Sequence, residues 1–248
     1  SAIRGSRGDG YYLASCLGHE IAEPVPALVQ LHAADPLVKM AAGVRADAGI
    51  TTWIDDKKTA FWRGELQITD YGLSGIVVFQ SSRLAAYGLL EKKDVCLEVD
   101  FLPEYAKTEA EGLLQRRLQM REGNLTLEQS LQGLLHDKLI APILKRAGLS
   151  AEKLAGDCDK EDVTRLLAAL RHYVVKITDT HGFSNAQVTA GGVKTDRIDP
   201  KTMESELVPG LFFAGEVLDV DGICGGYNLQ WAWSSGALAG MHCIGKRK

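Results

Sequence analysis

The segment Leu211–Gly236 carries the residues best suited to chemistry in this chain. An apolar run, Leu211–Ala214, leads to an acidic residue, Glu216, and the pair Gly225-Gly226 then opens a predicted helix. A carboxylate in this position can accept hydrogen bonds from hydroxyl groups. Bare backbone N–H groups and the positive end of a helix attract anionic oxygens. The order of these features suits a pyrophosphate group or the ring of a flavin.

The glycine pair and a second glycine-rich segment together define a candidate cofactor site. Glycines allow the backbone to approach a ligand closely, and the N–H groups of Asn228 and Leu229 are expected to face the pyrimidine end of a flavin, where negative charge builds up on reduction. Upstream, Ala190–Val193 is predicted to form a tight turn beside the flavin edge. The predicted cofactor-binding residues are Gly215, Glu216, Asp221, Gly225, Gly226, Tyr227, Asn228, Leu229, Gln230, Thr189, Ala190, Gly191 and Gly192.

Each of these features also has an ordinary structural explanation. A glycine pair can begin a helix for packing reasons, Glu216 can be an exposed loop carboxylate, and Gly191-Gly192 can form a turn without a ligand. Trp231 and Trp233 are expected to be core residues under the last helix. No arrangement of Ser, His and Asp suggests nucleophilic catalysis, and the six His residues lack metal-ligand spacing. No catalytic residue and no metal site are therefore assigned.

The composition indicates the class of protein. The chain has 248 residues, of which 46% are hydrophobic and 24% charged, as expected of a soluble globular protein with one large domain or two small ones. A net charge of −4 argues against broad nucleic-acid binding, which needs a basic face. No apolar run reaches the roughly 18 residues of a membrane helix, and the polar first residues contain no signal peptide. We therefore expect a cytoplasmic protein without nucleic-acid or membrane partners.

The cysteines indicate a reducing environment. They are odd in number and scattered, and no two of them form a C-x-x-C motif, which is typical of free thiols rather than of disulfides or a zinc site. Cys224 is not expected to act as a redox thiol, because no partner lies at that spacing. The sequon Asn124-Leu-Thr126 is attributed to chance. The five cysteines are Cys16, Cys96, Cys158, Cys224 and Cys243.

Hydrophobic periodicity predicts mixed secondary structure. Helices are expected over Gly8–Gly18, Gly75–Leu90 and Tyr227–Cys243, and three or four helices are expected between Tyr105 and about Leu170. Hairpin turns are expected at Asp47–Gly49 and Asp55–Lys58. The predicted strands are Ala27–Leu31, Ala42–Ala46, Thr51–Ile54, Thr59–Trp62, Glu65–Thr69, Val95–Phe101, Val174–Thr178, Gln187–Thr189 and Leu211–Ala214.

Several motifs resemble one bacterial flavoprotein family, the BaiN/RdsA-type NAD(P)/FAD-dependent oxidoreductases. Three of them are Ala190-Gly-Gly-Val193, Pro209-Gly-Leu-Phe-Phe-Ala-Gly-Glu216 and Gly225-Gly-Tyr-Asn-Leu-Gln-Trp-Ala-Trp-Ser-Ser-Gly236. In addition, Gly5-Ser-Arg-Gly-Asp-Gly-Tyr11 is similar to the family's Gly-Ser-Thr-Gly-Asp-Gly-Tyr, with Arg7 in place of Thr, and Gly64–Gly75 is similar to Gly-Glu-Leu-Leu-Phe-Thr-His-x-Gly-Leu-Ser-Gly. The resemblance covers essentially the whole chain.

The resemblance implies an α+β fold in several segments. Family members begin with a Rossmann-like FAD domain that carries a Gly-x-Gly-x-x-Gly loop, and this sequence does not contain that pattern. On this template residues 1–23 are a remnant of the first FAD-domain segment. Residues 24–183 are an insertion domain, β-rich and barrel-like over 24–104 and helical over 105–173. Residues 184–248 are the returning C-terminal segment of an incomplete Rossmann-like FAD domain.

The resemblance also implies a function. The chain is expected to be part of an FAD-dependent oxidoreductase that transfers hydride between NAD(P)H, the flavin and a small organic substrate, with the N-terminal FAD-binding half as its missing partner. Glu216 is implied to contact the ribityl chain, and Gly5–Gly10 to lie near the same ring. The alternative is a catalytically silent fragment that does not bind FAD alone. A nucleotide-sensing or RNA-associated protein is a third hypothesis, which the acidic net charge disfavours.

Overall fold

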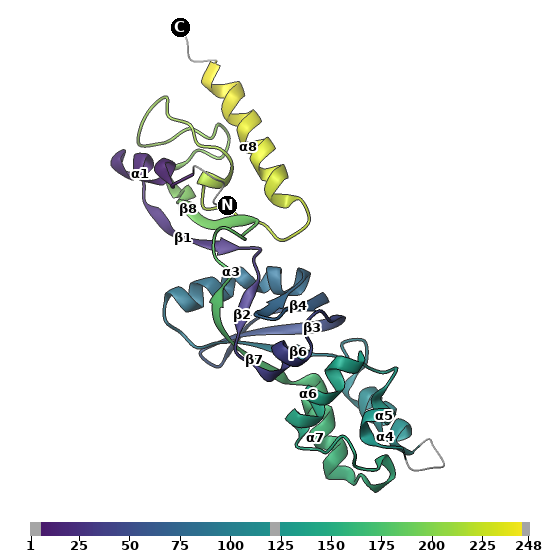
Figure 1. Cartoon of the computed structure of the whole chain (residues 1–248). Coiled ribbons are helices and arrows are strands. Elements are labelled where there is room, and N and C mark those ends of the chain that lie inside the picture. Colours follow the sequence, from purple (N-terminus) through teal and green to yellow (C-terminus); the bar gives the residue numbers. More distant parts are fainter. Residues whose placement is uncertain (1–5, 120–124, 245–248) are drawn as a thin grey trace. The chain divides into compact units, whose positions relative to one another are not determined.

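The computed structural model describes residues 6–119 and 125–244 and divides the chain into two compact units (Figure 1). The smaller unit comprises residues 1–29 and 180–248, and the larger comprises residues 30–179. Gly5 of the N-terminal motif and Asn124 of the sequon lie outside the described residues. Among the helices of the described residues, none has both the length and the apolar character that crossing a bilayer requires. The prediction that residues 24–183 are an insertion into an FAD domain stays a prediction.

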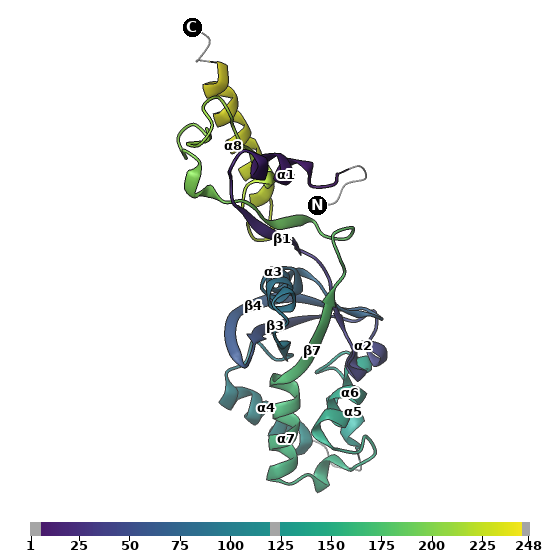
Figure 2. The same cartoon turned by 90° about the vertical axis from the view of Figure 1, so that its left-hand side faces the viewer.

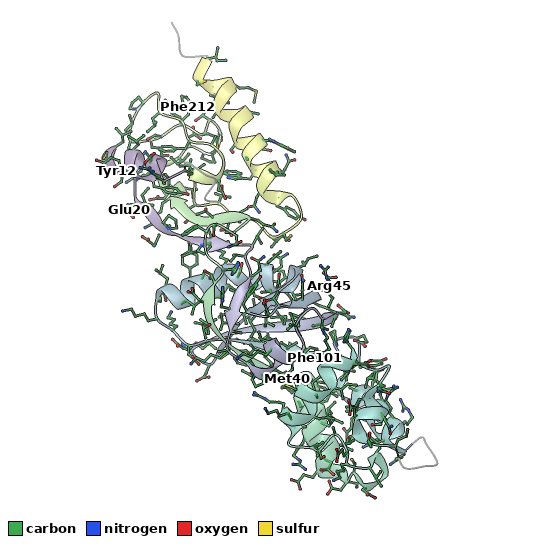
Figure 3. The ribbon with its side chains drawn as sticks, in the orientation of Figure 1. Tyr12, Glu20, Met40, Arg45, Phe101 and Phe212 are labelled. Atoms are coloured by element: carbon green, nitrogen blue, oxygen red, sulfur yellow. The ribbon has the colours of Figure 1, made fainter. Side chains whose placement is uncertain are left out.

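The larger unit is built around a closed six-stranded barrel. Around the barrel the strands are β2 (Leu31–Ala33), β5 (Gly72–Ser74), β4 (Lys57–Ile68), β3 (Arg45–Ile54), β6 (Val95–Asp100) and β7 (Tyr173–Thr180). Fully buried apolar side chains such as Ile50, Leu66 and Leu97 belong to its core. Arg45, labelled in Figure 3, forms an ion pair of 2.9 Å with Glu65 on the paired strand. The mixed fold with a barrel-like part was predicted correctly.

The β3–β4 hairpin is longer than the sequence patterns predicted. The expected turn at Asp55–Lys58 is confirmed, since Asp55 and Asp56 have φ of 47° and 59° between the two strands. The turn expected at Asp47–Gly49 is wrong, because these residues lie inside β3. Gly49 is in the strand because the ring of Phe61 occupies the space of its missing side chain, 3.0 Å from an ideal Cβ. The strands expected at Thr59–Trp62 and Glu65–Thr69 are parts of one strand, β4.

Helices cover two sides of the barrel (Figure 2). On one side lies α3 (Ile76–Leu90), and on the other lies a group made by α4 (Lys107–Gln119), α5 (Leu127–Leu131), α6 (Asp137–Ala147) and α7 (Lys160–Arg171). Short helices α2 (Pro36–Met40) and η1 (Ala155–Asp157) complete the unit. Phe101, labelled in Figure 3, is buried beside Tyr173, with ring centres 6.2 Å apart. The helices predicted over 75–90 and 105–170 are confirmed.

The smaller unit contains one two-stranded antiparallel sheet, formed by β1 (Ile21–Ala27) and β8 (Val188–Val193). Its helical elements are α1 (Asp9–Cys16), η2 (Thr195–Arg197), η3 (Gly215–Val217) and α8 (Tyr227–Ile244). The tight turn predicted at Ala190–Val193 is wrong, because pairing with β1 makes these residues a strand. The strand predicted at Ala27–Leu31 is also wrong, since Leu28 at φ 48° separates β1 from β2. Of the strand predicted at Leu211–Ala214, only Phe212 (labelled in Figure 3) forms an isolated bridge, with Glu204.

Helix α8 begins near its predicted position but is not packed as expected. Ser235 and Ala239 are its two buried residues among the described ones. The indole N–H of Trp231 donates to the carbonyl of Gly215 at 3.2 Å, which ties the helix to η3. Trp233 is 66% exposed, so its prediction as a core residue is wrong. Residues two apart on a helix point in different directions, so one tryptophan packs and the other does not.

Candidate functional site

A cavity of about 620 Å³ lies in the smaller unit and has the size of a small-molecule site. The first turn of α1, β1, the start of β8 and η3 surround it. Its lining residues are Ser6, Arg7, Gly8, Asp9, Gly10, Tyr11, Glu23, Pro24, Phe183, Thr189, Glu216 and Val217. Of the predicted cofactor-binding residues, Thr189 and Glu216 lie here.

The pairing of β1 with β8 brings distant segments to this cavity. Pro26 is opposite Thr189 in the register, and a β-bulge between Ala22 and Val25 lies beside Glu23 and Pro24. A bulge turns side chains away from the regular alternation of a strand. The cavity therefore depends on contacts between residues that are more than 150 positions apart in the sequence, such as Pro26 and Thr189.

Glu216 is held at the cavity by hydrogen bonds from two directions. Its carboxylate Oε1 accepts a bond of 2.7 Å from the backbone N–H of Thr189. The preceding residue, Gly215, donates its N–H to Ser235 Oγ at 2.9 Å and accepts from the indole of Trp231. Hydrogen bonds to an ionised carboxylate are stronger than those between neutral groups. The α8 helix thus positions the Gly215–Glu216 peptide, and β8 orients the carboxylate.

The cavity is rich in acidic groups. Asp9, Glu23 and Glu216 line it, while Arg7 is the one lysine or arginine among the described lining residues. Burial, and then the negative charge of Glu216, raise the pKa of Tyr11 above its ordinary value of 10.0. Tyr11 is protonated at neutral pH, as an ordinary tyrosine is, and the raised pKa extends this to higher pH, so its hydroxyl can donate a hydrogen bond. This combination suits a ligand with several hydroxyl groups and a hydrogen-bond acceptor.

The glycines of β8 serve the protein's own packing. A Cβ at Gly191 would lie 2.6 Å from the carbonyl oxygen of Glu23, and one at Gly192 would lie 2.6 Å from that of Val217. Both glycines are therefore required by backbone contacts within the unit, with or without a ligand. Ala190 is completely buried. Within the predicted segment Thr189–Gly192, only Thr189 lines the cavity.

The glycines before α8 have a different environment. Gly225 and Gly226 have φ of 128° and 91°, values that favour glycine. A Cβ at Gly226 would have no protein atom within 4 Å, so the space in front of this residue is open. The carbonyl of Gly226 accepts from the N–H of Gln230 at 3.0 Å. The N–H groups of Tyr227, Asn228 and Leu229 thus belong to the first turn, where N–H groups have no partner inside the helix.

The side chain of Asn228 organises the loop before the helix. Its Oδ1 accepts from the N–H of Gly222 at 2.8 Å, and its Nδ2 donates to the carbonyl of the same residue at 3.0 Å. Asp221 is half-buried beside this pair, and the side chain of Gln230 donates to Ser234 Oγ. These contacts hold the helix start in one conformation. None of Asp221, Gly225, Gly226, Tyr227, Asn228, Leu229 and Gln230 is among the described residues that line the cavity.

The donor groups of the smaller unit fit an organic cofactor rather than a metal. In residues 6–119 and 125–244 there is no group of three or more His, Cys, Asp or Glu side chains that could hold a metal ion. An exposed oriented carboxylate, a helix start with open space before it, and a cavity of small-molecule size are all present. A carboxylate of this kind can accept from ligand hydroxyl groups, and an open helix start can bind an anionic group.

Sequence patterns did not identify five lining residues: Tyr11, Glu23, Pro24, Phe183 and Val217. Glu23 and Phe183 lie in segments with no motif: the β1–β8 pairing brings Glu23 to Thr189, and Phe183 lies in the loop before β8. Tyr11 ends the motif Gly5–Tyr11 and lies in the helix predicted over Gly8–Gly18. The position of that tyrosine directly after Asp9-Gly10 was the one available signal.

Comparisons with known proteins agree with the motifs. Residues 2–242 match the family model described as HI0933-like protein Rossmann domain. The chain is 43% identical over 236 residues to the 3-dehydro-bile acid delta(4,6)-reductase of Clostridium scindens, which covers 95% of this chain and 58% of the reductase. It is 32% identical to the ribosomal RNA dihydrouridine synthases of Haemophilus influenzae and of Escherichia coli. Each match covers 91% of this chain, together with 53% of the Haemophilus influenzae protein and 54% of the Escherichia coli protein. The chain thus spans about half the length of the curated relatives it matches.

Proposed function

Because the chain belongs to the HI0933-like family of flavoprotein oxidoreductases, we propose that its smaller unit forms the flavin side of an FAD site. In this proposal the cavity receives the ring and the upper ribityl chain, and the start of α8 lies beside the ring's pyrimidine end. When bound, the flavin supplies the hydride chemistry, while the protein supplies binding, orientation and electrostatics.

The hydrogen bond between Thr189 and Glu216 is the observation that carries this proposal. It fixes an exposed carboxylate at the wall of a cavity of about 620 Å³, between the two segments that sequence motifs assigned to the cofactor. A carboxylate has about four acceptor positions, so one bond to Thr189 leaves room for others. In the proposed complex Glu216 accepts hydrogen bonds from ribityl hydroxyl groups.

The start of α8 would stabilise negative charge on the reduced ring. Its first N–H groups and the helix dipole together favour an anion by about 0.3–1 kcal/mol when exposed. Gly226 has open space in front of it, and Asn228 holds the loop so that this space is kept clear of the chain. Gly226 and Asn228 would thus keep the chain's own side chains out of the plane of the flavin ring.

Tyr11 is the residue that we propose to face the substrate. Its hydroxyl is protonated at neutral pH, and burial and Glu216 disfavour the phenolate further. A protonated hydroxyl at this point can donate to a carbonyl oxygen of a substrate and orient it. The named relatives are a 3-dehydro-bile acid delta(4,6)-reductase and two ribosomal RNA dihydrouridine synthases. We therefore propose reduction of a double bond in a small organic substrate, with NAD(P)H as the electron donor.

The apolar side chains of α8 suit the remainder of a dinucleotide-binding domain. Leu229, Trp233, Met241 and Ile244 are large and exposed, and Ala239 is one of two buried residues on the helix. Exposed apolar groups of this number on one helix indicate a protein contact. The proposed partner is the segment that carries the Gly-x-Gly-x-x-Gly loop and the adenosine site.

The five free thiols favour a reducing compartment, and we propose the cytoplasm.

Titration with FAD tests this function. The chain is compared with a hybrid to which the part of the Clostridium scindens reductase outside the matched region is joined, and FAD binding is followed by flavin fluorescence. We expect weak binding by the chain alone and tight binding by the hybrid. In the hybrid, Glu216→Gln should weaken FAD binding about fivefold to tenfold, because it removes a charged acceptor. The control substitution Glu206→Gln, at another exposed glutamate, should leave FAD binding unchanged. Equal binding by both variants would refute the role of Glu216, and a hybrid that folds without binding FAD would favour the silent-fragment alternative.

A further inference from the structure

A second cavity, of about 350 Å³, lies within the larger unit and is independent of the proposed flavin site. It is enclosed by three neighbouring strands, β4, β3 and β6, and by residues of α4 and α7. Phe61, Thr51 and Glu98 form one row across these strands, because Thr51 is paired with both of the others. Alternation along a strand places them on the face opposite to buried Ile50 and Leu97.

Phe61 gives this cavity an aromatic wall. Its ring lies over Gly49, where an ideal Cβ would be 3.0 Å from the ring, so the absence of a side chain lets the ring lie against the sheet. The side chain is nevertheless 52% exposed. The ammonium group of Lys58 lies 5.6 Å from the ring centre. The ring therefore presents apolar surface with a cation beside it. Leu167 and Ala168 of α7 supply further apolar lining.

The two acidic residues of the cavity each have a basic side chain beside them. Asp100 Oδ2 accepts from Nε and Nη2 of Arg171 at 3.1 and 2.8 Å. Glu98 Oε1 lies 3.3 Å from Nδ1 of His172, the next residue along the chain. Asp100 therefore has a permanent cationic partner, whereas the contact of Glu98 is an ion pair only when the His172 ring is protonated.

Cationic groups remain available around the same cavity. Lys107, at the start of α4, lines the cavity and is exposed. Neither Lys107 nor Lys58 forms an ion pair with any described residue. The third guanidinium nitrogen of Arg171, Nη1, is buried and has no hydrogen-bond partner in the described structure. Because Nη1 is buried, a ligand in the cavity does not reach it, and the exposed Lys107 supplies the charge contact.

We propose that this cavity binds a small organic anion that combines a flat apolar ring with a carboxylate. The ring stacks on Phe61 and packs against Leu167 and Ala168, and the carboxylate pairs with Lys107 on the side towards Arg171. A volume of about 350 Å³ accommodates a molecule of one to three fused rings. Neutral hydrophobic ligands would lack the charge contact with Lys107.

Titration with 2-naphthoate, and with naphthalene-2-carboxamide as its neutral counterpart, tests this inference in the complete 248-residue chain. Binding is measured by calorimetry, and the affected residues are located by NMR shifts. We expect saturable binding of the carboxylate, with the carboxamide weaker by about fivefold, as expected for loss of one exposed charge contact. Lys107→Gln should lower the affinity for the carboxylate to that for the carboxamide. Phe61→Ala should lower the affinity for both by about tenfold.

The controls separate this site from general binding to a positive surface. Lys57→Gln changes an exposed lysine outside the cavity and should leave both affinities unchanged. Phe61 and Lys107 are exposed, so their variants should fold, which a circular dichroism spectrum verifies. Absence of saturable binding by 2-naphthoate, or binding that neither Phe61→Ala nor Lys107→Gln alters, would overturn the proposal.

Discussion

The backbone N–H of Thr189 donates a hydrogen bond of 2.7 Å to the carboxylate of Glu216, and so joins β8 to the segment before α8. Each residue lies in a motif that sequence analysis assigned separately to one cofactor. The structure brings the two motifs into contact through this bond, while the glycines that follow Thr189 are used for packing. Glu216 therefore belongs both to the fold and to the candidate site.

Replacement of Glu216 should change the titration of Tyr11. Burial is the larger cause of the raised pKa of Tyr11 and the charge of Glu216 the smaller one. Glu216→Gln keeps the side chain's size but removes the charge, so the pKa of Tyr11 should fall towards 10 and remain above it. Phenolate absorbance as a function of pH measures this, with Tyr11→Phe identifying the signal. The same fall in the control Glu206→Gln would show that the charge acts non-specifically.

The two tryptophans of α8 should respond differently to truncation. Trp231→Ala removes a half-buried ring and the hydrogen bond to Gly215, and should lower the free energy of unfolding by about 2 kcal/mol. Trp233→Ala, at an exposed position, should change it by less than about 0.5 kcal/mol. Urea unfolding followed by circular dichroism tests both. In the hybrid, Trp233→Ala should become destabilising, and an unchanged stability there would contradict the proposed contact on α8.

Ser205 should be needed for the stability of the smaller unit. Its Oγ accepts from the N–H groups of Leu207 and Val208 at 3.0 and 2.9 Å, so its own proton is directed to Nε2 of buried His19 at 2.8 Å. Ser205→Ala leaves these groups without their partner and should cost about 2 kcal/mol. Exposed Ser184→Ala is the matched control in urea unfolding. Equal stability of the two variants would show that water replaces the hydroxyl.

Asp162 should make the larger unit sensitive to acid. Its side chain is 3% exposed, and the hydrogen bond from Lys153 first, then that from Arg165, lowers its pKa below the ordinary value of 3.8. A lowered folded-state pKa adds stability above the unfolded-state value, and this stability is lost as pH falls through the folded-state value. Asp162→Asn should therefore cost about 1.5–3 kcal/mol at neutral pH. The difference from the unaltered chain should shrink below about pH 4, and a difference independent of pH would refute this.

Tyr173 should show the opposite pH dependence. Burial, and then the charge of Asp35 and the hydrogen bond of 2.9 Å to its Oδ1, raise the pKa of Tyr173. A raised folded-state pKa gives stability that is complete below the unfolded-state value of about 10 and is lost as pH rises through the folded-state value. Tyr173→Phe should lower the free energy of unfolding by about 1 kcal/mol at neutral pH. Urea unfolding above pH 10 should show this advantage of the tyrosine decreasing, and an increase would contradict the argument.

Local features were predictable because they depend on neighbouring residues. The helix that begins after Gly75, the turn at Asp55-Asp56 and the helical group between Tyr105 and Leu170 follow from glycine conformation, turn residues and the 3.6-residue period. The prediction failed where a strand's partner decides its limits. Asp47–Gly49 has the composition of a turn, but the ring of Phe61 covers Gly49 inside a long hairpin.

For the candidate site, the sequence alone determined which residue types can meet a cofactor: the carboxylate of Glu216, and the glycines and first N–H groups of α8. The tertiary structure decided which of them lie together. Only the β1–β8 register brings Glu23 and Thr189 to one cavity, and only packing against η3 separates Trp231 from Trp233. The physical reason is that conformational preference acts over a few residues, whereas a cavity results from contacts between segments that the chain's topology brings together.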